Sequence, residues 1–260
     1  MEFLHNGLPK RPMKTTFSRG RHEEPDLSGR KDMTRDLISM LSRKNIASFE
    51  FISRQFDHEV QGGSVIKPLQ GRGRVNGDVS VTMPVLNSDK GVILSQALFP
   101  SYSNIDTYNM VAASIDTAVR NIIAAGGRLD RIALLDNFCW CSSNDPERLG
   151  QLKRAAMACY DTAVGYGTPL ISGKDSMFND FKGFDENGKP IIISIPPTLL
   201  ISSIAVMDDA GKAVSLDAKV PGDIVYVIGE NKAEMGGSEY FAMVGEQTRR
   251  RGFVGNNVPV

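Results

Sequence analysis

The sequence has few cysteines, no excess of either charge and no long apolar runs. Each of these shortages excludes a class of protein. Three cysteines occur in 260 residues, at Cys139, Cys141 and Cys159. This odd number, with no targeting segment recognisable at the N-terminus, is typical of a reduced, cytoplasmic setting. A single residue separates Cys139 from Cys141, and no second group of Cys or His lies near them. We therefore expect thiols rather than a zinc site.

The charges balance. The chain carries 30 Lys plus Arg and 30 Asp plus Glu, so its formal net charge is zero. No overall basic field favours nucleic acid as a partner. The longest apolar runs are too short for a membrane span, so we expect no membrane partner either. A chain of this length can bury a core as one large domain, or as one domain plus pieces.

The expected organisation has three parts. Residues 1–33 are polar and contain several glycines and prolines, which is typical of a linker or arm. Residues 34–215 alternate between helical and strand patterns and form the main α/β domain. Residues 216–260 begin a second domain with a strand over 223–229 and do not complete it. The chain is therefore expected to be a piece of a longer protein.

Local patterns predict the elements of the main domain. Apolar residues at helical spacing and capping residues indicate four helices, over 34–41, 46–52, 106–125 and 145–164. Alternating or continuous apolar runs indicate five strands, over 75–85, 91–99, 131–136, 168–172 and 199–206. In the first helix, Leu37, Ile38 and Leu41 share a face. In the fourth, Leu149, Leu152, Ala156, Cys159 and Ala163 are expected to point inward.

The most informative segment for chemistry is residues 170–177, where Gly173, Lys174, Asp175 and Ser176 follow an apolar run. Glycine lets the backbone approach a ligand closely. The other three offer a charge, a metal ligand and a hydroxyl, which suits phosphate and Mg²⁺ in a nucleotide-handling enzyme. The segment is not a Walker A motif, because five residues rather than four separate Gly167 from Gly173 and an aspartate follows the lysine. A phosphate or metal site and a surface turn with a Lys174–Asp175 ion pair both remain open.

Three other positions carry weaker signals. Asp136 ends an expected buried strand, where ligand binding and helix capping are both open. Asp78 follows Gly77 in a segment that reads as a turn. His58 lies between two acidic residues, which can raise its pKa. Such a loop histidine is either structural or a catalytic group.

Six motifs, taken together and in order, resemble the large, ATP-dependent phosphoribosylformylglycinamidine synthase family of purine biosynthesis. They span nearly the whole chain: Asp57–Gly63, Asp116–Ile122, Leu135–Trp140, Gly173–Met177, Pro196–Ile201 and Gly236–Tyr240. Residues 3–10 are similar to the end of the preceding domain of that family. The resemblance implies an aminoimidazole-ribotide (AIR) synthetase-like α/β domain with a mixed sheet and flanking helices. The start of a C-terminal-type domain follows it, and the whole matches the second half of the duplicated enzyme.

The resemblance also implies nucleotide-binding residues. Asp136, Gly173, Ser176 and Gly77 are expected to contact ATP, and Ser176 is expected to contact the substrate phosphate as well. Lys174 stands where smaller family members have a metal-binding Asn, so no metal is assigned to it.

An auxiliary Mg²⁺–nucleotide site is implied at Asp78 and Asn121, which match metal ligands of the long family members. Thr117 stands where that site has a Glu. Loss of a carboxylate weakens a hard-cation site, because Mg²⁺ is usually held by one or two carboxylates plus phosphates.

The function implied by the resemblance is the conversion of formylglycinamide ribonucleotide to its amidine. ATP activates the amide oxygen, and ammonia from a glutamine amidotransferase subunit or domain displaces the phosphate. The chain is expected to be inactive alone, with the missing first half or a second copy as partner. Val79, Val81, Met83, Val92 and Leu94 are expected to form a bare apolar sheet face that such a partner covers. Two alternatives stay open: a non-catalytic assembly half, and another ATP-dependent member of the superfamily such as a selenophosphate or thiamin-phosphate kinase type.

Overall fold

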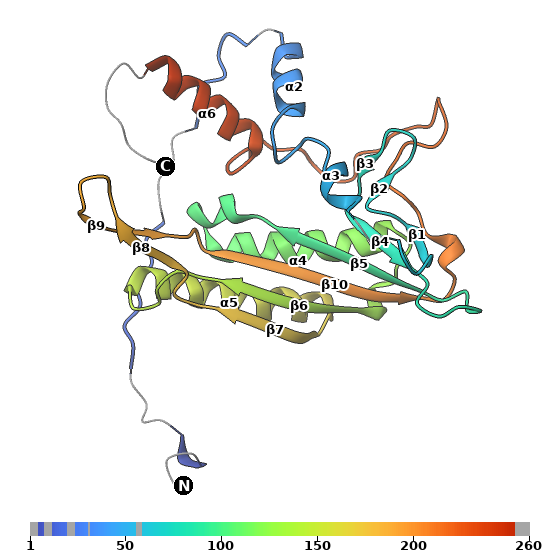
Figure 1. Cartoon of the computed structure of the whole chain (residues 1–260), viewed down its shortest axis with the longest axis horizontal. Coiled ribbons are helices and arrows are strands. Elements are labelled where there is room, and N and C mark those ends of the chain that lie inside the picture. Colours follow the sequence, from blue (N-terminus) through green and yellow to red (C-terminus); the bar gives the residue numbers. More distant parts are fainter. Residues whose placement is uncertain (1–4, 8–11, 20–23, 31, 56–58, 253–260) are drawn as a thin grey trace.

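The computed structural model describes residues 5–7, 12–19, 24–30, 32–55 and 59–252, with side chains up to residue 245. Its centre is a six-stranded sheet with the spatial order β1-β4-β5-β10-β6-β7 (Figure 1). These strands are β1 Ser64–Ile66, β4 Val79–Thr82, β5 Gly91–Leu98, β10 Thr198–Met207, β6 Ile132–Cys139 and β7 Leu170–Ser176. Two two-stranded ribbons accompany the sheet: β2 Leu69–Gln70 with β3 Val75–Asn76, and β8 Asp180–Phe184 with β9 Pro190–Ser194.

The helices of the described residues range from one short turn to 21 residues. They are α2 Thr34–Leu41, α3 Glu50–Ser53, α4 Thr107–Ala124, α5 Pro146–Tyr166 and α6 Glu239–Gly252, with 3₁₀ turns η1 Pro100–Asn104, η2 Leu129–Arg131 and η3 Ala210–Lys212. Helices α4 and α5 pack against each other, and α4 crosses β5 and β10. None of the helices in the described part of the chain has the length and apolarity needed to span a bilayer.

The sheet is mixed, as the family resemblance implies. Every neighbouring pair is antiparallel except β6 and β7, which run parallel. The parallel pair is joined through α5, in the usual manner of a β-α-β crossover. The expected mixed α/β fold with flanking helices is therefore confirmed.

The two faces of the sheet differ in cover. Along β5 and β10, every second residue is buried against the helices, including Ile93 and Ile201. The residues between them stay partly or fully exposed, so one face carries the core and the other is open. The prediction of a bare face is wrong for Val81, which is completely buried in the core, and for Val79, which packs against that core. Val92 and Leu94, in contrast, do lie on the open face, where Leu94 is 43% exposed.

The caps of α4 and α5 form as the sequence predicts. The Asp106 carboxylate accepts a hydrogen bond from the Tyr108 amide at 2.9 Å, and the Asp145 carboxylate accepts one from the Glu147 amide at 2.8 Å. Each satisfies a main-chain donor that the first turn of a helix leaves free. The predicted inward face of α5 is wrong at Ala156, which is exposed. Its neighbour Ala155 is buried instead.

Residues 12–19 of the expected linker are all exposed, but residues 16–19 contact the domain. The Thr16 amide donates to the Pro146 carbonyl at 3.0 Å, and the Ser18 amide donates to the Glu147 carboxylate at 2.9 Å. The guanidinium of Arg154 stacks on the Phe17 ring, 4.3 Å from its centroid. We call residues 12–19 the strap, because they cross the N-terminal end of α5.

The first helix faces the opposite way from its apolar pattern. Leu37, Ile38 and Leu41 are 61–64% exposed, whereas Asp36 is buried. Arg30 binds the Asp36 carboxylate, and the Tyr240 hydroxyl of α6 donates to it at 2.7 Å. A buried ion pair, rather than the apolar stripe, therefore connects α2 to the rest of the molecule.

The region after the sheet also departs from expectation. No regular strand forms over 223–229, and helix α6 appears where none was predicted. The polar residues over 181–189, whose pattern indicates a hairpin-like loop, do form part of the β8–β9 hairpin. The two departures depend on contacts across the fold that a local pattern does not contain.

Candidate functional site

The predicted phosphate segment lies on β7, beside the carboxyl-terminal half of β6. Asp136 pairs with Gly173, Asn137 with Lys174, and Cys139 with Ser176. Strand β6 continues three residues beyond Asp136, because its pairing with β10 extends to Cys139. Asp136 therefore does not end the strand, as the sequence had indicated, but lies within it.

On the covered face, Asp136 lies directly beside Gly173. A Cβ added at Gly173 would stand 2.4 Å from the Asp136 carboxylate oxygen Oδ1, so only glycine fits there without rearrangement. Burial raises the pKa of Asp136, and the nearby Asp175 carboxylate adds to this shift. Burial, together with the charge of Asp136, also raises the pKa of Cys159 on α5 to about 12. This side of the strand pair thus carries two carboxylates, a half-buried one at Asp136 and an exposed one at Asp175.

On the open face, the same two strands present a different set of groups. Asn137 and Cys139 of β6 lie beside Lys174 and Ser176 of β7. The Lys174 ammonium donates a hydrogen bond to the Ser176 hydroxyl. The Cys139 thiol lies 3.8 Å from the Asn137 amide oxygen. An ammonium, a hydroxyl and an amide on one open surface are suited to binding a phosphate.

Strand geometry argues against the surface-turn reading of this segment and leaves the phosphate reading a prediction. Successive side chains of a strand point to opposite faces. Lys174 and Asp175 therefore diverge, and they do not form the ion pair of a surface turn. For the same reason, the predicted nucleotide ligands divide into Asp136 and Gly173 on one face and Ser176 on the other. Their role in nucleotide binding stays a prediction.

The predicted auxiliary metal ligands meet through one serine. The Asn121 amide on α4 donates to the Ser95 hydroxyl at 3.1 Å, and that hydroxyl donates to the Asp78 carbonyl at 2.8 Å. The side chain of Asp78 itself is exposed. Gly77 lies against Gln70, whose amide nitrogen would be 1.9 Å from an added Cβ. The structure thus brings Asp78 and Asn121 into one neighbourhood and explains the glycine before Asp78.

The donor set of this neighbourhood is small. In the ranges that the structure describes, no three of His, Cys, Asp and Glu are grouped as a metal site would need. Thr117 lies one turn before Asn121 on α4. Asp116 is engaged with the Tyr166 hydroxyl and with Arg120. One carboxylate and one amide fit Mg²⁺ only together with the phosphates of a nucleotide.

The two candidate sites are separate. Asp78 immediately precedes β4, and Asn137 lies on β6, three strands away in the order β4-β5-β10-β6. Neighbouring strands lie about 4.8 Å apart, so the lateral separation is about 14 Å. One small phosphate cannot touch both places.

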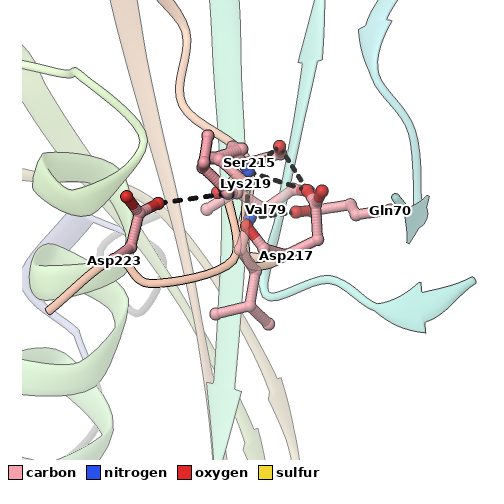
Figure 2. A network of polar contacts seen from close by, with 8 residues as sticks. Gln70, Val79, Ser215, Asp217, Lys219 and Asp223 are labelled. Carbon is pink, nitrogen blue, oxygen red and sulfur yellow. Dashed lines mark hydrogen bonds and ion pairs between the residues drawn. The ribbon is translucent and has the colours of Figure 1, made fainter. Parts of the chain in front are cut away.

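Gln70 is a site residue that the sequence did not reveal. Its amide nitrogen donates to the Val79 carbonyl at 3.3 Å, and its amide oxygen accepts from the Leu216 amide (Figure 2). In the same network Asp217 binds Lys219 at 2.9 Å. A cavity of about 330 Å³ lies beside Gln70 and Ser215. A single buried glutamine has no pattern of its own, so only the contacts identify it.

A second cavity, of about 230 Å³, collects positive charge. Arg54, Lys67 and Arg74 line it together with Glu59. Lys67 pairs with Glu59 at 2.5 Å, so much of this charge is already balanced. His58, the loop histidine considered above, lies outside the described residues.

Comparisons with known proteins point to one family. No family model matches the chain. It is 31% identical over 219 residues to phosphoribosylformylglycinamidine synthase subunit PurL of Alkaliphilus metalliredigens, covering 84% of this chain and 27% of that subunit. The PurL of Methanothrix thermoacetophila is 29% identical over 245 residues, covering 91% and 29% of the two chains.

Solved structures share the fold. The structure of PurLQS from Thermotoga maritima superposes with a TM-score of 0.51 at 20% identity, covering 81% of this chain and 28% of the other. The chain thus spans between a quarter and a third of the length of the relatives that it matches. These matches confirm the family resemblance: the chain is a relative of one segment of the phosphoribosylformylglycinamidine synthase subunit PurL and has the AIR-synthetase-like fold.

Proposed function

We propose that this chain supplies one α/β domain of a phosphoribosylformylglycinamidine synthase. In that role it would take part in the ATP- and glutamine-dependent conversion of formylglycinamide ribonucleotide to its amidine. The observation that carries the proposal is the open-face group of Asn137, Lys174 and Ser176, within a segment that is similar to the synthase subunit. A phosphate on this face would lie between the sheet and whatever covers it.

Lys174 and Ser176 would bind the phosphate of ATP or of the substrate. An ammonium and a hydroxyl stabilise the charge on a transferring phosphoryl group when they are already positioned before reaction. Gly173 allows the strand to pass close to Asp136. Lys174 is the residue in which the chain departs from the smaller family members, and here it serves as a cation rather than as a metal ligand.

We assign Asp78 and Asn121 to an auxiliary Mg²⁺–nucleotide site. Mg²⁺ bound there would neutralise nucleotide phosphates, while the Asp78 carboxylate and the Asn121 amide oxygen held the ion. The Ser95 hydroxyl is hydrogen-bonded to both residues and so fixes their relative position. The buried Gln70 holds the strand that follows Gly77, so the loop before β4 is positioned from both sides.

The chain alone would have no synthase activity, since it matches less than a third of the subunit length. Its partners would be the missing first half or a second copy, and a glutamine amidotransferase that supplies ammonia. A cytoplasmic location agrees with its three free thiols. Synthase turnover by the purified chain with ATP, ammonia and formylglycinamide ribonucleotide would overturn this part of the proposal.

Calorimetric titration of Mg·ATP and Mg·ADP into the purified chain tests the sites. Lys174→Ala should weaken binding about tenfold, the effect of losing roughly 1.4 kcal/mol of charge-assisted hydrogen bonding. Lys182→Ala is the charge-matched control on the exposed β8 and should leave binding unchanged. If binding is lost with Asp78→Ala and not with Lys174→Ala, the nucleotide occupies the auxiliary site. Equal binding by all the variants contradicts both sites.

An assembly role is the second candidate. Leu94, Leu98 and Val206 on the open face are 43–46% exposed, so this face carries apolar side chains that a partner could cover. A first-half partner could cover this face with no nucleotide involved. This role would be favoured if a complex with a first-half chain formed equally well with and without nucleotide. Lys174→Ala would then also leave the synthase activity of that complex intact.

A further inference from the structure

Two arginines and a lysine converge on one cavity beside α3. Arg54, Lys67 and Arg74 line this hollow, whose volume is about 230 Å³. Arg54 directly follows α3, Lys67 lies between β1 and β2, and Arg74 lies in the turn between β2 and β3. Figure 1 shows α3 beside the β2–β3 ribbon. Three segments of the chain thus each bring a cation to one place, which we call the α3 pocket.

Hydrogen bonds between the walls hold the α3 pocket in shape. The Phe49 amide, at the start of α3, donates to the side-chain oxygen of Asn76 on β3 at 3.1 Å. The side-chain amide of Asn76 donates to the Ala47 carbonyl, also at 3.1 Å. Helix α3 is therefore fixed to the ribbon through both polar atoms of one side chain. A site that is already formed loses less conformational entropy when a ligand binds.

The cations of the α3 pocket outnumber the carboxylates that pair with them. Arg54 and Arg74 bind the same oxygen of Glu50, at 3.0 and 2.5 Å, so their Nη1 atoms lie no more than 5.5 Å apart. Lys67 pairs with Glu59 at 2.5 Å. The hydrogen bond from Arg54 and the charge of Arg74 lower the pKa of Glu50, so this carboxyl group is ionised at neutral pH. Three positive charges thus face two negative ones, and one positive charge remains without a counter-charge.

The two guanidinium groups keep most of their hydrogen-bond donors available. A guanidinium carries five N–H donors in a planar fork. Within the described part of the chain, Arg54 and Arg74 use only Nη1, and both use it on Glu50. The remaining N–H groups can bind two oxygens of a phosphate at once, which is the geometry that an arginine fork matches best.

Arg74 has a backbone conformation that favours glycine. Its φ is 50°, in the left-handed region, and its amide closes the turn on the Gly71 carbonyl at 3.2 Å. A side chain at this position costs free energy, because its Cβ crowds the following carbonyl oxygen. Two glycines, Gly71 and Gly73, occupy the same turn, yet the left-handed position before β3 carries an arginine. Such strain is concentrated at ligand sites, and an anion in the pocket would account for it.

We propose that the α3 pocket binds the phosphate group of a small phosphorylated molecule. Arg54 and Arg74 donate to the phosphate oxygens, and Lys67 adds positive charge at the rim. Pockets that enclose a whole drug-sized ligand measure about 300–1,000 Å³, so this smaller hollow takes the phosphate and leaves the rest of the molecule at its mouth.

The α3 pocket is separate from both sites considered above. The residues that line it include none of Asp78, Asn121, Asn137, Lys174 and Ser176. The inference therefore does not rest on the proposed function, and either can fail without the other.

Calorimetric titration of inorganic phosphate into the purified 260-residue chain, at about 150 mM salt, tests the site. We expect saturable binding with a dissociation constant on the order of 1 mM, and about tenfold weaker binding by Arg74→Gly. Because glycine relieves the left-handed backbone, the thermal unfolding midpoint of Arg74→Gly should not fall. Arg54→Gln leaves the turn unchanged and should weaken phosphate binding by a similar factor, so the test does not depend on one variant.

Arg72→Gly is the matched control. It removes the same charge from the same turn, but Arg72 does not line the pocket, so phosphate affinity should stay within about twofold. The proposal is overturned if Arg72→Gly weakens binding as much as Arg74→Gly, or if the unmodified chain shows no saturable binding up to about ten times the expected dissociation constant. Binding that is lost with Lys174→Ala and kept by Arg74→Gly would place the anion on the open sheet face and would overturn it too.

Acetate separates a phosphate site from one built for a carboxylate. A tetrahedral dianion can engage both arginine forks, whereas acetate carries one charge and two oxygens. Acetate should therefore bind about tenfold more weakly than phosphate under the same conditions. Equal or tighter binding of acetate would mean that the pocket receives an acidic side chain of another protein segment, and the proposal would then be wrong.

Discussion

The carbonyl oxygen of Thr16 lies directly against the α-carbon of Gly150: a Cβ added at Gly150 would stand 1.9 Å from that oxygen. The strap can cross α5 only where the helix has no side chain. Gly150→Ala should therefore displace the strap and destabilise the chain by about 1–3 kcal/mol, although alanine favours the helix. Urea unfolding measures this loss, and hydrogen exchange of the Thr16 and Ser18 amides reports the release of the strap.

Gly165 provides the matched control on the same helix. Nothing lies within 4 Å of a Cβ added there. Gly165→Ala should stabilise the chain by about 0.5–1 kcal/mol, since alanine loses less conformational entropy in a helix than glycine. If the two substitutions changed stability equally, the strap would not be docked as described.

Asp106 should make the fold sensitive to acid. Its carboxylate is 2% exposed and accepts hydrogen bonds from Arg154 at 3.1 and 2.6 Å. Burial raises the pKa of Asp106, but the hydrogen bonds from Arg154 and the Tyr108 amide outweigh it and leave the pKa below its usual value. The folded state thus binds fewer protons than the unfolded state, so stability is full above about pH 4 and declines as the pH falls further.

Asp106→Asn should remove this acid-sensitive step and lower the free energy of unfolding at neutral pH. A loss of about 2–3 kcal/mol is expected, below the value for a fully buried pair because the Arg154 side chain keeps 30% exposure. Asp130→Asn breaks the exposed pair with Arg128 and serves as the control, with little change. Chemical unfolding of the unmodified chain and the two variants between pH 3 and pH 7 measures how the free energy of unfolding depends on pH in each.

Local sequence rules predicted the elements that local interactions build. The caps at Asp106 and Asp145 and the strand β10 are clear in the sequence, because a capping side chain and an apolar run act within a few residues. The docking of the strap at Gly150 was not predictable, since it joins segments more than a hundred residues apart. The strand expected over 223–229 failed to form for a related reason: a strand exists only when another strand accepts its hydrogen bonds.

The candidate site was predictable in its residue types and not in its geometry. The pattern around Gly173 and Lys174 indicates phosphate chemistry, and the family resemblance adds Asp136. Which face each side chain takes depends on the register between β6 and β7, and one step in register reverses every side chain. That register separates Ser176 from Asp136, and no property of either residue could have shown it.

Ser95 links the two predicted auxiliary ligands, and its removal should be costly. Ser95→Ala leaves the Asp78 carbonyl and the Asn121 amide without this partner, at an expected cost of about 1–2 kcal/mol. Gln96→Ala changes the next residue of β5, which is exposed on the open face, and should cost much less. Thermal unfolding of the two variants compares them, and equal shifts would contradict the linking role of Ser95.

Gly173 and Asp136 should be strongly coupled. Gly173→Ala places a Cβ 2.4 Å from the Asp136 carboxylate and should destabilise the fold by about 1–3 kcal/mol. In an Asp136→Ala background the clashing oxygen is absent, so the same substitution should cost much less. The double-mutant cycle measured by urea unfolding should give an interaction energy of about 0.5–3 kcal/mol, whereas additive effects would mean that the two residues do not touch. Because β7 is an edge strand, it could also shift to relieve the clash. Asp175→Ala, which lies on the covered face too, is the reference: its effect on stability should add to that of Gly173→Ala.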